Sequence, residues 1–216
     1  MSLEVNAGIL MKPKKNMIDN STYIKRLLRI EPDYFYFVQI IQRKKENPEL
    51  PGSNNRIIRS YNIDSITKFE KNMPEIIKLC DMFNARAYIH LNRRRWSKIA
   101  LECLRHNAEL IANEQYEGIK SSLETVIGRN NCETKENKTW ILDCDGMDTP
   151  SPLMMAIIEY ECQPLTLDLT KPKCLHTIET KNGCHLITRP FDTQVFHSKY
   201  PDIEIHKDNP TILYIP

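Results

Sequence analysis

The sequence predicts an α+β fold, in which helices pack on a mixed or antiparallel sheet. Segments with helical and with strand periodicity alternate along the chain, and two pairs of strands are expected to form hairpins, which implies antiparallel pairing. Of the 216 residues, 41% are hydrophobic and 27% are charged. This composition is typical of a globular protein and excludes a disordered or collagen-like chain.

The first half of the chain is expected to contain a long hairpin. Asn20-Ser21-Thr22 starts a helix that ends before Pro32, because the residue preceding a proline is disfavoured in the helical conformation. The aromatic and β-branched residues 34–42 predict a strand, and residues 56–63 predict its returning partner across a loop rich in proline and glycine. Later elements of this half are a helix over 66–83, a strand over 87–91 and helices over 97–115 and 115–127.

The second half is expected to begin with a polar connection over 128–138. Asn182-Gly183 is a strong hairpin turn signal, because both residues can adopt positive φ angles. The expected elements are a strand over 139–146, a helix over 150–160, a hairpin of 176–180 with 184–189, a short helix within 191–200, and a final pair of strands over 203–206 and 211–215.

One α+β domain is expected over residues 1–216, with a flexible N-terminal segment over 1–19. The connection 128–138 is the one place where two lobes would separate. The longest aliphatic run, residues 153–158, is far shorter than the roughly 20 residues needed to span a bilayer, so no membrane association is expected.

Charge is unevenly distributed along the chain. Residues 1–105 contain 20 Lys and Arg against 11 Asp and Glu, whereas residues 106–216 contain 10 against 17. This asymmetry suggests a basic surface for a polyanion and an acidic surface for a cation, unless folding interleaves the two halves. The seven cysteines include no Cys-x-x-Cys pair, which favours a reducing, cytoplasmic setting over a disulfide framework or a standard zinc site.

Asp143-Cys144-Asp145-Gly146 is the most informative motif. Strand side chains alternate, so Asp143 and Asp145 are expected on one face of the strand. Two adjacent carboxylates repel each other unless a cation or a shared proton compensates, and their oxygens are ligands suited to Mg²⁺ or Mn²⁺. The alternative is an ordinary turn at the end of a strand, where Asp and Gly are common.

The strand of residues 184–189 carries a second set of polar residues. Alternation places His185 and Arg189 on one face, with Lys181 at the turn. If this strand lies beside the Asp143 strand, the carboxylates would hold a metal ion while these cationic groups hold phosphate oxygens. For His185 taken alone, a structural histidine is the alternative.

Leu142-Asp143-Cys144-Asp145, followed some forty residues later by Asn182-Gly183-Cys184-His185, resembles the archaeo-eukaryotic primase (primase–polymerase) superfamily, as a small phage-type or divergent member. The resemblance implies an RRM-like βαββαβ core and template-directed nucleotidyl transfer in DNA replication, with NTP or dNTP and a nucleic acid template as partners. Asp143 and Asp145 would then bind the metal ion, and His185 would contact the phosphates of the nucleotide.

Two positions depart from the pattern of this family. Its histidine motif usually begins with Ser, where this chain has Gly183, and its third acidic residue is not evident. Asp208 is the best candidate for that third metal ligand. An inactive member that only binds nucleic acid is therefore an alternative.

The Asp143–Gly146 motif also resembles that of haloacid dehalogenase-like phosphatases, in which Asp143 would be the nucleophile and Asp145 the general acid. That fold needs further motifs on successive strands of a parallel sheet. Only 70 residues follow Gly146, and most of their strands are expected in hairpins.

Basic residues next to aromatic ones are candidates for nucleic-acid binding. Arg93, Arg94, Arg95 and Trp96 suit phosphate contact and base stacking, and Lys44 and Lys45 form a second basic stretch. The alternative is a solvated helix start and a solvated hairpin tip.

Overall fold

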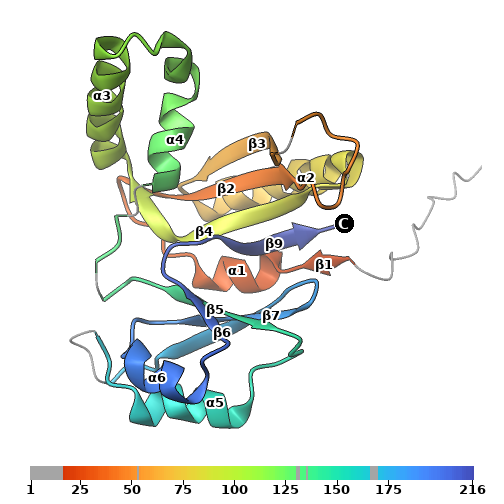
Figure 1. Cartoon of the computed structure of the whole chain (residues 1–216), viewed down its shortest axis with the longest axis vertical. Coiled ribbons are helices and arrows are strands. Elements are labelled where there is room, and N and C mark those ends of the chain that lie inside the picture. The colour runs from red at the N-terminus through yellow and green to blue at the C-terminus, as the bar shows by residue number, and fades with distance from the viewer. Residues whose placement is uncertain (1–16, 53, 130–131, 135, 166–169) are drawn as a thin grey trace, which may run out of the picture.

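The computed structural model describes residues 17–216 except 53, 130–131, 135 and 166–169, and it places them in two sheets with their helices (Figure 1). Every strand pair among these residues is antiparallel. The α+β fold predicted from the sequence is confirmed. No helix in the described part of the chain is long and apolar enough to cross a membrane.

The first sheet has five strands in the order β1-β9-β4-β2-β3. Its members are β1 (Ile18–Asp19), β2 (Tyr34–Gln42), β3 (Arg56–Ile63), β4 (Arg86–Arg95) and β9 (Thr211–Ile215). Helix α2 (Ile66–Phe83) connects β3 to β4 and packs on this sheet through Phe69, Met73, Ile76 and Cys80, whose spacing of three to four residues places them on one face. The short helix α1 (Ser21–Leu27) adds Ile24 to the same core.

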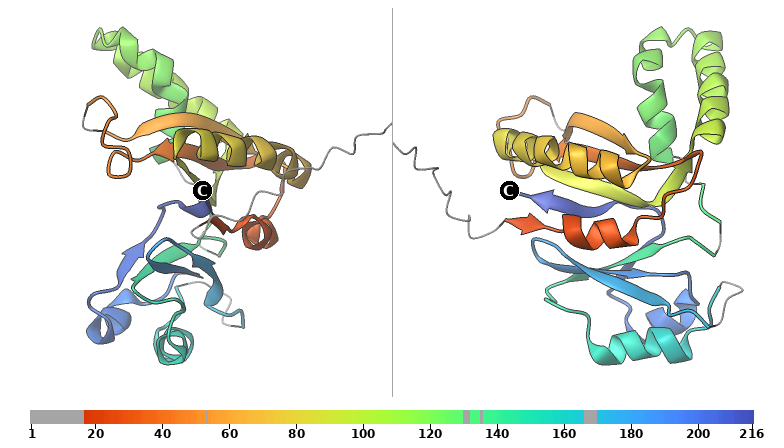
Figure 2. Two further views of the ribbon diagram at one scale, coloured as in Figure 1. Left: turned by 90° about the vertical axis from the view of Figure 1, so that its right-hand side faces the viewer. Right: turned by 180° about the vertical axis from the view of Figure 1, so that it is seen from behind.

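A pair of helices projects from one end of the first sheet (Figures 1 and 2). It consists of α3 (Trp96–Ala112), a 3₁₀ turn (Tyr116–Ser121) and α4 (Ser122–Arg129). Where the pair joins the sheet, Ile99 and Ile127 pack on Phe35 and Phe37 of β2. These contacts fix the base of the projection to the sheet.

The second sheet is built from one continuous part of the chain. Its elements are β5 (Trp140–Asp145), α5 (Pro152–Ala156) extended by a π turn (Ile157–Glu161), β6 (Cys174–Glu179), β7 (Gly183–Thr188), α6 (Thr193–Lys199) and β8 (Glu204–His206). The strand order is β6-β7-β5-β8. The elements of this unit follow the order βαββαβ. If β5, β6, β7 and β8 are counted as strands 1 to 4, their order in the sheet, read from the β8 edge, is 4-1-3-2, which is the topology expected of an RRM-like core.

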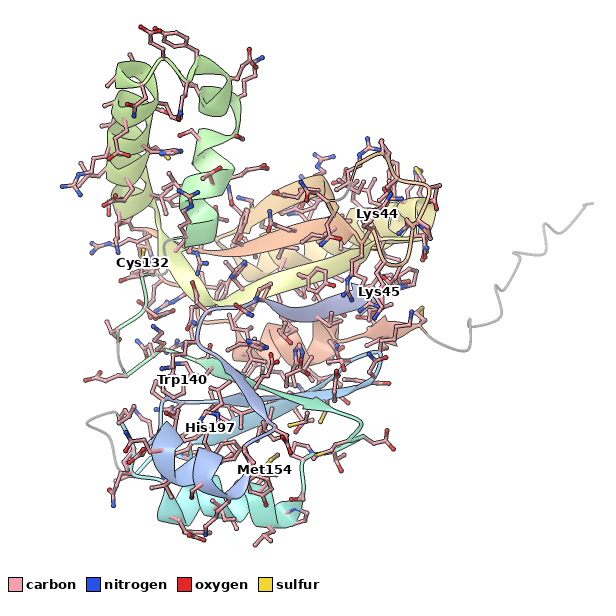
Figure 3. All side chains as sticks on the ribbon, viewed as in Figure 1. Lys44, Lys45, Cys132, Trp140, Met154 and His197 are labelled. Carbon is pink, nitrogen blue, oxygen red and sulfur yellow. The ribbon has the colours of Figure 1, made fainter. Side chains whose placement is uncertain are left out.

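The two faces of the second sheet have different partners. Trp140, Leu142 and Cys144 of β5 belong to a core that includes residues of α5 and α6, of which Met154 is labelled in Figure 3. Ile141 on the opposite face belongs to the core of the first sheet. Because strand residues alternate, Asp143 and Asp145 share the face of Ile141 and point towards the first sheet.

Several expectations about the fold need correction. The strand expected over 87–91 extends through Arg95, so the three arginines lie in β4 and α3 begins at Trp96. Strands β8 and β9 exist but do not pair with each other, since β8 joins β5 and β9 joins β1 and β4. Of the segment 1–19 that was expected to be flexible, Ile18 and Asp19 form β1, and residues 1–16 lie outside the described part.

Candidate functional site

Asp143 and His185 face each other across two central strands of the second sheet. They are register partners in the β5–β7 pair, and the next pair on the same face of the sheet is Asp145 with Gly183. The Nε2 atom of His185 lies 3.7 Å from Oδ1 of Asp143. The geometric relation expected from the sequence, two carboxylates and one imidazole on one face, is present.

The polar atoms of this pair are only partly satisfied. Oδ1 of Asp143 is buried and accepts no hydrogen bond from the described residues. Nδ1 of His185 lies 2.9 Å from Oγ1 of Thr211, a buried residue of β9, so the first sheet fixes the ring. Burial lowers the pKa of His185 below its usual value, and the Asp143 carboxylate only partly opposes that shift.

The pair opens into a cleft of about 890 Å³ between the two sheets. The second sheet contributes Asp143, Asp145, His185 and His206 to its lining. The first sheet and its loops contribute Arg43, Lys45, Glu46, Arg86 and Tyr88, and the β6–β7 turn contributes Lys181. A cleft with carboxylates on one wall and several cations on the other suits a metal ion together with an anionic ligand.

Glu46 organises the basic wall of the cleft. It accepts hydrogen bonds from Nε and Nη2 of Arg86, and Nζ of Lys181 lies 3.0 Å from its Oε1. Burial alone would raise the pKa of Glu46, but these two cations outweigh it and the pKa is lowered. Arg43 and Lys45, in contrast, have no ion-pair partner among the described residues, and Lys45 is exposed (Figure 3). These two cations are free to bind a ligand.

Gly183 and Gly146 bring the β6–β7 turn against the end of β5. A Cβ atom on Gly183 would lie 2.3 Å from the carbonyl oxygen of Cys144, so no larger residue fits without moving β5. Gly146, which follows Asp145, has a φ angle of +78°, a conformation that favours glycine. The glycine at the position where the resembled family usually has Ser therefore has a local steric reason.

The third acidic residue expected, Asp208, is not part of the cleft lining. Its carboxylate lies 3.3 Å from Nη1 of Arg94 and also accepts a hydrogen bond from Asn92. Among the acidic residues, Glu204 of β8 is better placed than Asp208 to be a third ligand, because it is the register partner of Asp143 on the side opposite His185. It is exposed, and its Oε2 lies 3.5 Å from Nε2 of His206.

Arg93 and Arg94 of β4 do not form a surface for nucleic acid. Arg93 and Arg94 are 2% and 0% exposed. Arg93 forms an ion pair with the buried Glu133, and Arg94 donates to the Ile127 and Asn92 carbonyl oxygens besides Asp208. The expectation that they contact phosphates was wrong, because the structure already uses both guanidinium groups internally.

The neighbours of these arginines also have structural partners. Arg95 remains half-exposed, but its Nε donates to Asp33 over 2.8 Å. The Trp96 ring stacks on Phe35 with 4.0 Å between ring centroids. The Nζ atom of Lys44 bonds the carbonyl oxygens of Pro48 and Leu50 and so holds its own loop.

Arg189 does not join His185 in the cleft, because β7 ends at Thr188 and Arg189 lines a separate cavity of about 200 Å³. Of the predicted site residues, the structure therefore gathers Asp143, Asp145, His185, Lys181 and Lys45 around one cleft.

Sequence reasoning missed Glu46, His206 and Thr211 as members of the site. No local pattern marks them, since they come from a loop and two strands that meet the pair only after folding.

In the described part of the chain, no group of three or more His, Cys, Asp or Glu side chains could hold a metal ion. The donors present nevertheless fit Mg²⁺ or Mn²⁺ bound with a nucleotide, because such ions are commonly held by one or two carboxylates plus phosphate oxygens. Oδ1 of Asp143, which accepts no hydrogen bond from the described residues, is a carboxylate oxygen available to such an ion. All seven cysteines are free thiols and lie outside this cleft lining.

Comparison with known proteins gave no match, whether to a family model, to a curated protein or to a solved structure.

Proposed function

We propose that this chain is a metal-dependent nucleotidyltransferase of the primase–polymerase type, which binds an NTP or dNTP and a nucleic acid. The observation that carries the proposal is the register of the second sheet, in which Asp143 of the first strand of a βαββαβ unit stands opposite His185 of the third. Both side chains open into a cleft whose other wall is basic.

The carboxylates would bind the ion and the cations would bind the nucleotide. Mg²⁺ or Mn²⁺ would lower the charge on the phosphates and activate the attacking hydroxyl. Asp143 offers a buried oxygen that accepts no hydrogen bond from the residues that the structure describes, and Asp145 lies two residues further on the same face. Glu204 is the nearest candidate for a third carboxylate, because it is the other register partner of Asp143.

His185, Lys181, Lys45 and Arg43 would hold the triphosphate. The lowered pKa of His185 means that the ring is neutral near pH 7, so it would act as a hydrogen-bond donor to phosphate rather than as a cation. Its Nδ1 is fixed by Thr211, which leaves Nε2 directed at the side of Asp143. Positive charge would come from the lysines and Arg43 across the cleft.

The distribution of charge between the two halves of the chain agrees with these proposed roles of the two sheets. The basic residues 1–105 build four of the five strands of the first sheet, and the acidic residues 106–216 build the whole second sheet. A nucleic acid would therefore meet the first sheet, and the ion would meet the second. A reducing cytoplasm suits the free thiols.

The phosphatase interpretation is weaker on this fold. It expects Asp143 on a strand of a parallel sheet, whereas both neighbours of β5 are antiparallel to it. A protein that binds nucleic acid without catalysis is the second candidate, because Asp143 and Asp145 are the two side-chain carboxylates of the described cleft lining that have no Lys or Arg partner, whereas Glu46 is paired with Arg86 and Lys181.

Incubation with primed and unprimed templates, labelled nucleotides and Mn²⁺ or Mg²⁺ tests the proposal. Extended or new strands are expected with the unmutated protein, and Asp143→Asn is expected to reduce their yield at least about a hundredfold, since charge stabilisation at such sites is worth several kcal/mol. Asp202→Asn is the matched control, an exposed carboxylate outside the cleft lining.

No product, together with no nucleotide-dependent shift in melting temperature, would contradict the polymerase assignment. Nucleic-acid binding that persists in the Asp143→Asn variant while the unmutated protein makes no product would favour the non-catalytic alternative.

A further inference from the structure

A second groove, of about 860 Å³, runs along the free edge of the second sheet. β6 is the terminal strand in the order β6-β7-β5-β8, so one of its edges has no neighbouring strand among the described residues. The groove follows β6 from Cys174 to Glu179 and continues along the β6–β7 turn to Gly183. Asn20, which precedes α1, and Tyr23 of α1 form its opposite rim. Figure 2, seen from behind, shows α1 above the β6–β7 hairpin.

The main-chain groups of Thr177 and Glu179 point to the open edge. The Thr180 N–H donates to the Gly183 carbonyl oxygen, so Thr180, and by alternation Ile178, direct their main-chain groups at β7. The residues between them therefore face outward. In agreement, the Glu179 carbonyl oxygen accepts a hydrogen bond from the side chain of Asn20, which lies outside the sheet.

Three of these outward groups have no partner among the described residues: the N–H and C=O of Thr177 and the N–H of Glu179. A β-bulge at Leu175 limits the regular edge on the other side, where the register shifts between Cys174 and His176. The open edge therefore offers a short register centred on Thr177, enough for a few residues of an added strand.

The walls of the groove would contact alternate side chains of such a strand. On one side, the rings of Tyr23 and His176 lie 5.0 Å apart and form an aromatic wall. On the other side, the half-buried Met155 lines the groove, with the buried Leu186 behind it on the face covered by the helices. An extended peptide has side chains on both faces with a period of two, so it would place one set on each wall.

The charge of the groove favours a basic ligand. Asp148 and Glu179 are exposed and have no ion-pair partner among the described residues. The cation in the lining, Lys181, is paired with Glu46 in the other cleft. We propose that the β6 edge binds an extended segment of a partner protein by β-strand addition, and that this segment alternates basic and apolar residues.

A nucleic acid is a less suitable occupant of this groove. Its phosphates would meet the two free carboxylates, and it could not use the main-chain register of Thr177. The proposal does not depend on the polymerase assignment, since it uses neither Asp143 nor His185.

Fluorescence anisotropy with a labelled hexapeptide of alternating lysine and valine tests the proposal. Binding is expected for this probe and not for a hexapeptide of alternating glutamate and valine. Thr177→Pro is expected to weaken binding about tenfold, because it removes the outward N–H, while the ladder to β7 keeps its bonds. Thr177→Val is the matched control, which keeps the N–H and the branched shape and is expected to bind as the unmutated protein does.

A second measurement covers the case in which Thr177→Pro does not fold. In the unmutated protein, the probe is expected to slow hydrogen exchange at the amides of Thr177 and Glu179, and Asp148→Asn is expected to weaken binding of the probe most at low salt. Unchanged exchange at these two amides, equal binding by folded Thr177→Pro, or displacement of the probe by an equal concentration of oligothymidylate would overturn the proposal.

Discussion

Replacing Gly183 with alanine tests how closely the β6–β7 turn and the Asp145 end of β5 are fitted. An added Cβ would lie 2.3 Å from the Cys144 carbonyl oxygen, 3.0 Å from the Gly146 nitrogen and 3.1 Å from the Met147 carbonyl oxygen. Ordinary contacts to carbon begin near 3.4 Å. All three obstructing atoms belong to the backbone, so no side chain can rotate to relieve the clash.

The two strands must therefore separate by roughly 1 Å at the point where they present Asp145. Overpacking of this kind costs about 1–3 kcal/mol, and the upper part of that range is expected where only backbone can move. For a chain of this length, about 2–3 kcal/mol lowers the melting temperature by roughly 4–12 °C. Serine carries the same Cβ, so Gly183→Ser is expected to behave alike, although the resembled family uses Ser there.

Thermal unfolding followed by circular dichroism measures the effect, and Gly128→Ala provides the control. Gly128 lies in α4, and outside the helix backbone no atom of the described residues lies within 4 Å of an added Cβ, so alanine is expected to stabilise the chain by about 0.5–1 kcal/mol through helix propensity. If Gly183→Ala melts at or above the temperature of the unmutated protein, the steric account of this turn is refuted.

Three further predictions concern Arg94, His90 and the lysines of the β2–β3 loop. Arg94→Met should lower the free energy of unfolding, measured in urea, by about 3–5 kcal/mol, because the Asp208 carboxylate and the carbonyl oxygens of Ile127 and Asn92 lose the hydrogen bonds that they accept from Arg94. A loss below about 1 kcal/mol would contradict the structural role of this guanidinium group. Burial lowers the pKa of His90 to about 4, so as the pH falls the histidine is protonated in the unfolded chain before it is protonated in the folded one. The contribution of His90 to the free energy of unfolding should therefore be full above about pH 6.5 and decline towards pH 4. His90→Gln should flatten that part of the profile, and an unaltered profile would show that other groups control it. Lys45→Ala should weaken nucleotide binding about threefold to tenfold in calorimetry without changing stability, whereas Lys44→Ala should do the reverse; equal effects would contradict the placement of these lysines.

The carboxylate and histidine side of the cleft could be predicted from the sequence because its signals are local. A period of two places Asp143 with Asp145, and Asn182-Gly183 fixes the hairpin that carries His185. The helix and strand segments of the second sheet were likewise predicted, but the sequence did not show that β5 pairs with β7 on one side and with β8 on the other.

The arginines of β4 show where such reasoning fails. A run of three arginines is expected on a surface, yet Arg93 meets Glu133 forty residues away and Arg94 meets Asp208 at a separation of 114 residues. Buried charge is tolerated only with such partners, and no local pattern reveals a partner that distant. The same ion pair removed Asp208 from the list of available metal ligands.

The position of β9 has a consequence for how the chain folds. This strand lies between β1 and β4, and all five of its residues are buried. The first sheet therefore lacks an inner strand until residues 211–215 have been synthesised, whereas the second sheet is complete once β8 has formed. We expect the RRM-like unit to fold before the first sheet is complete, and β9, which follows β8 in the chain, then to insert between β1 and β4. The intermediate in which the edges of β1 and β4 are exposed is expected to be the one most prone to aggregate.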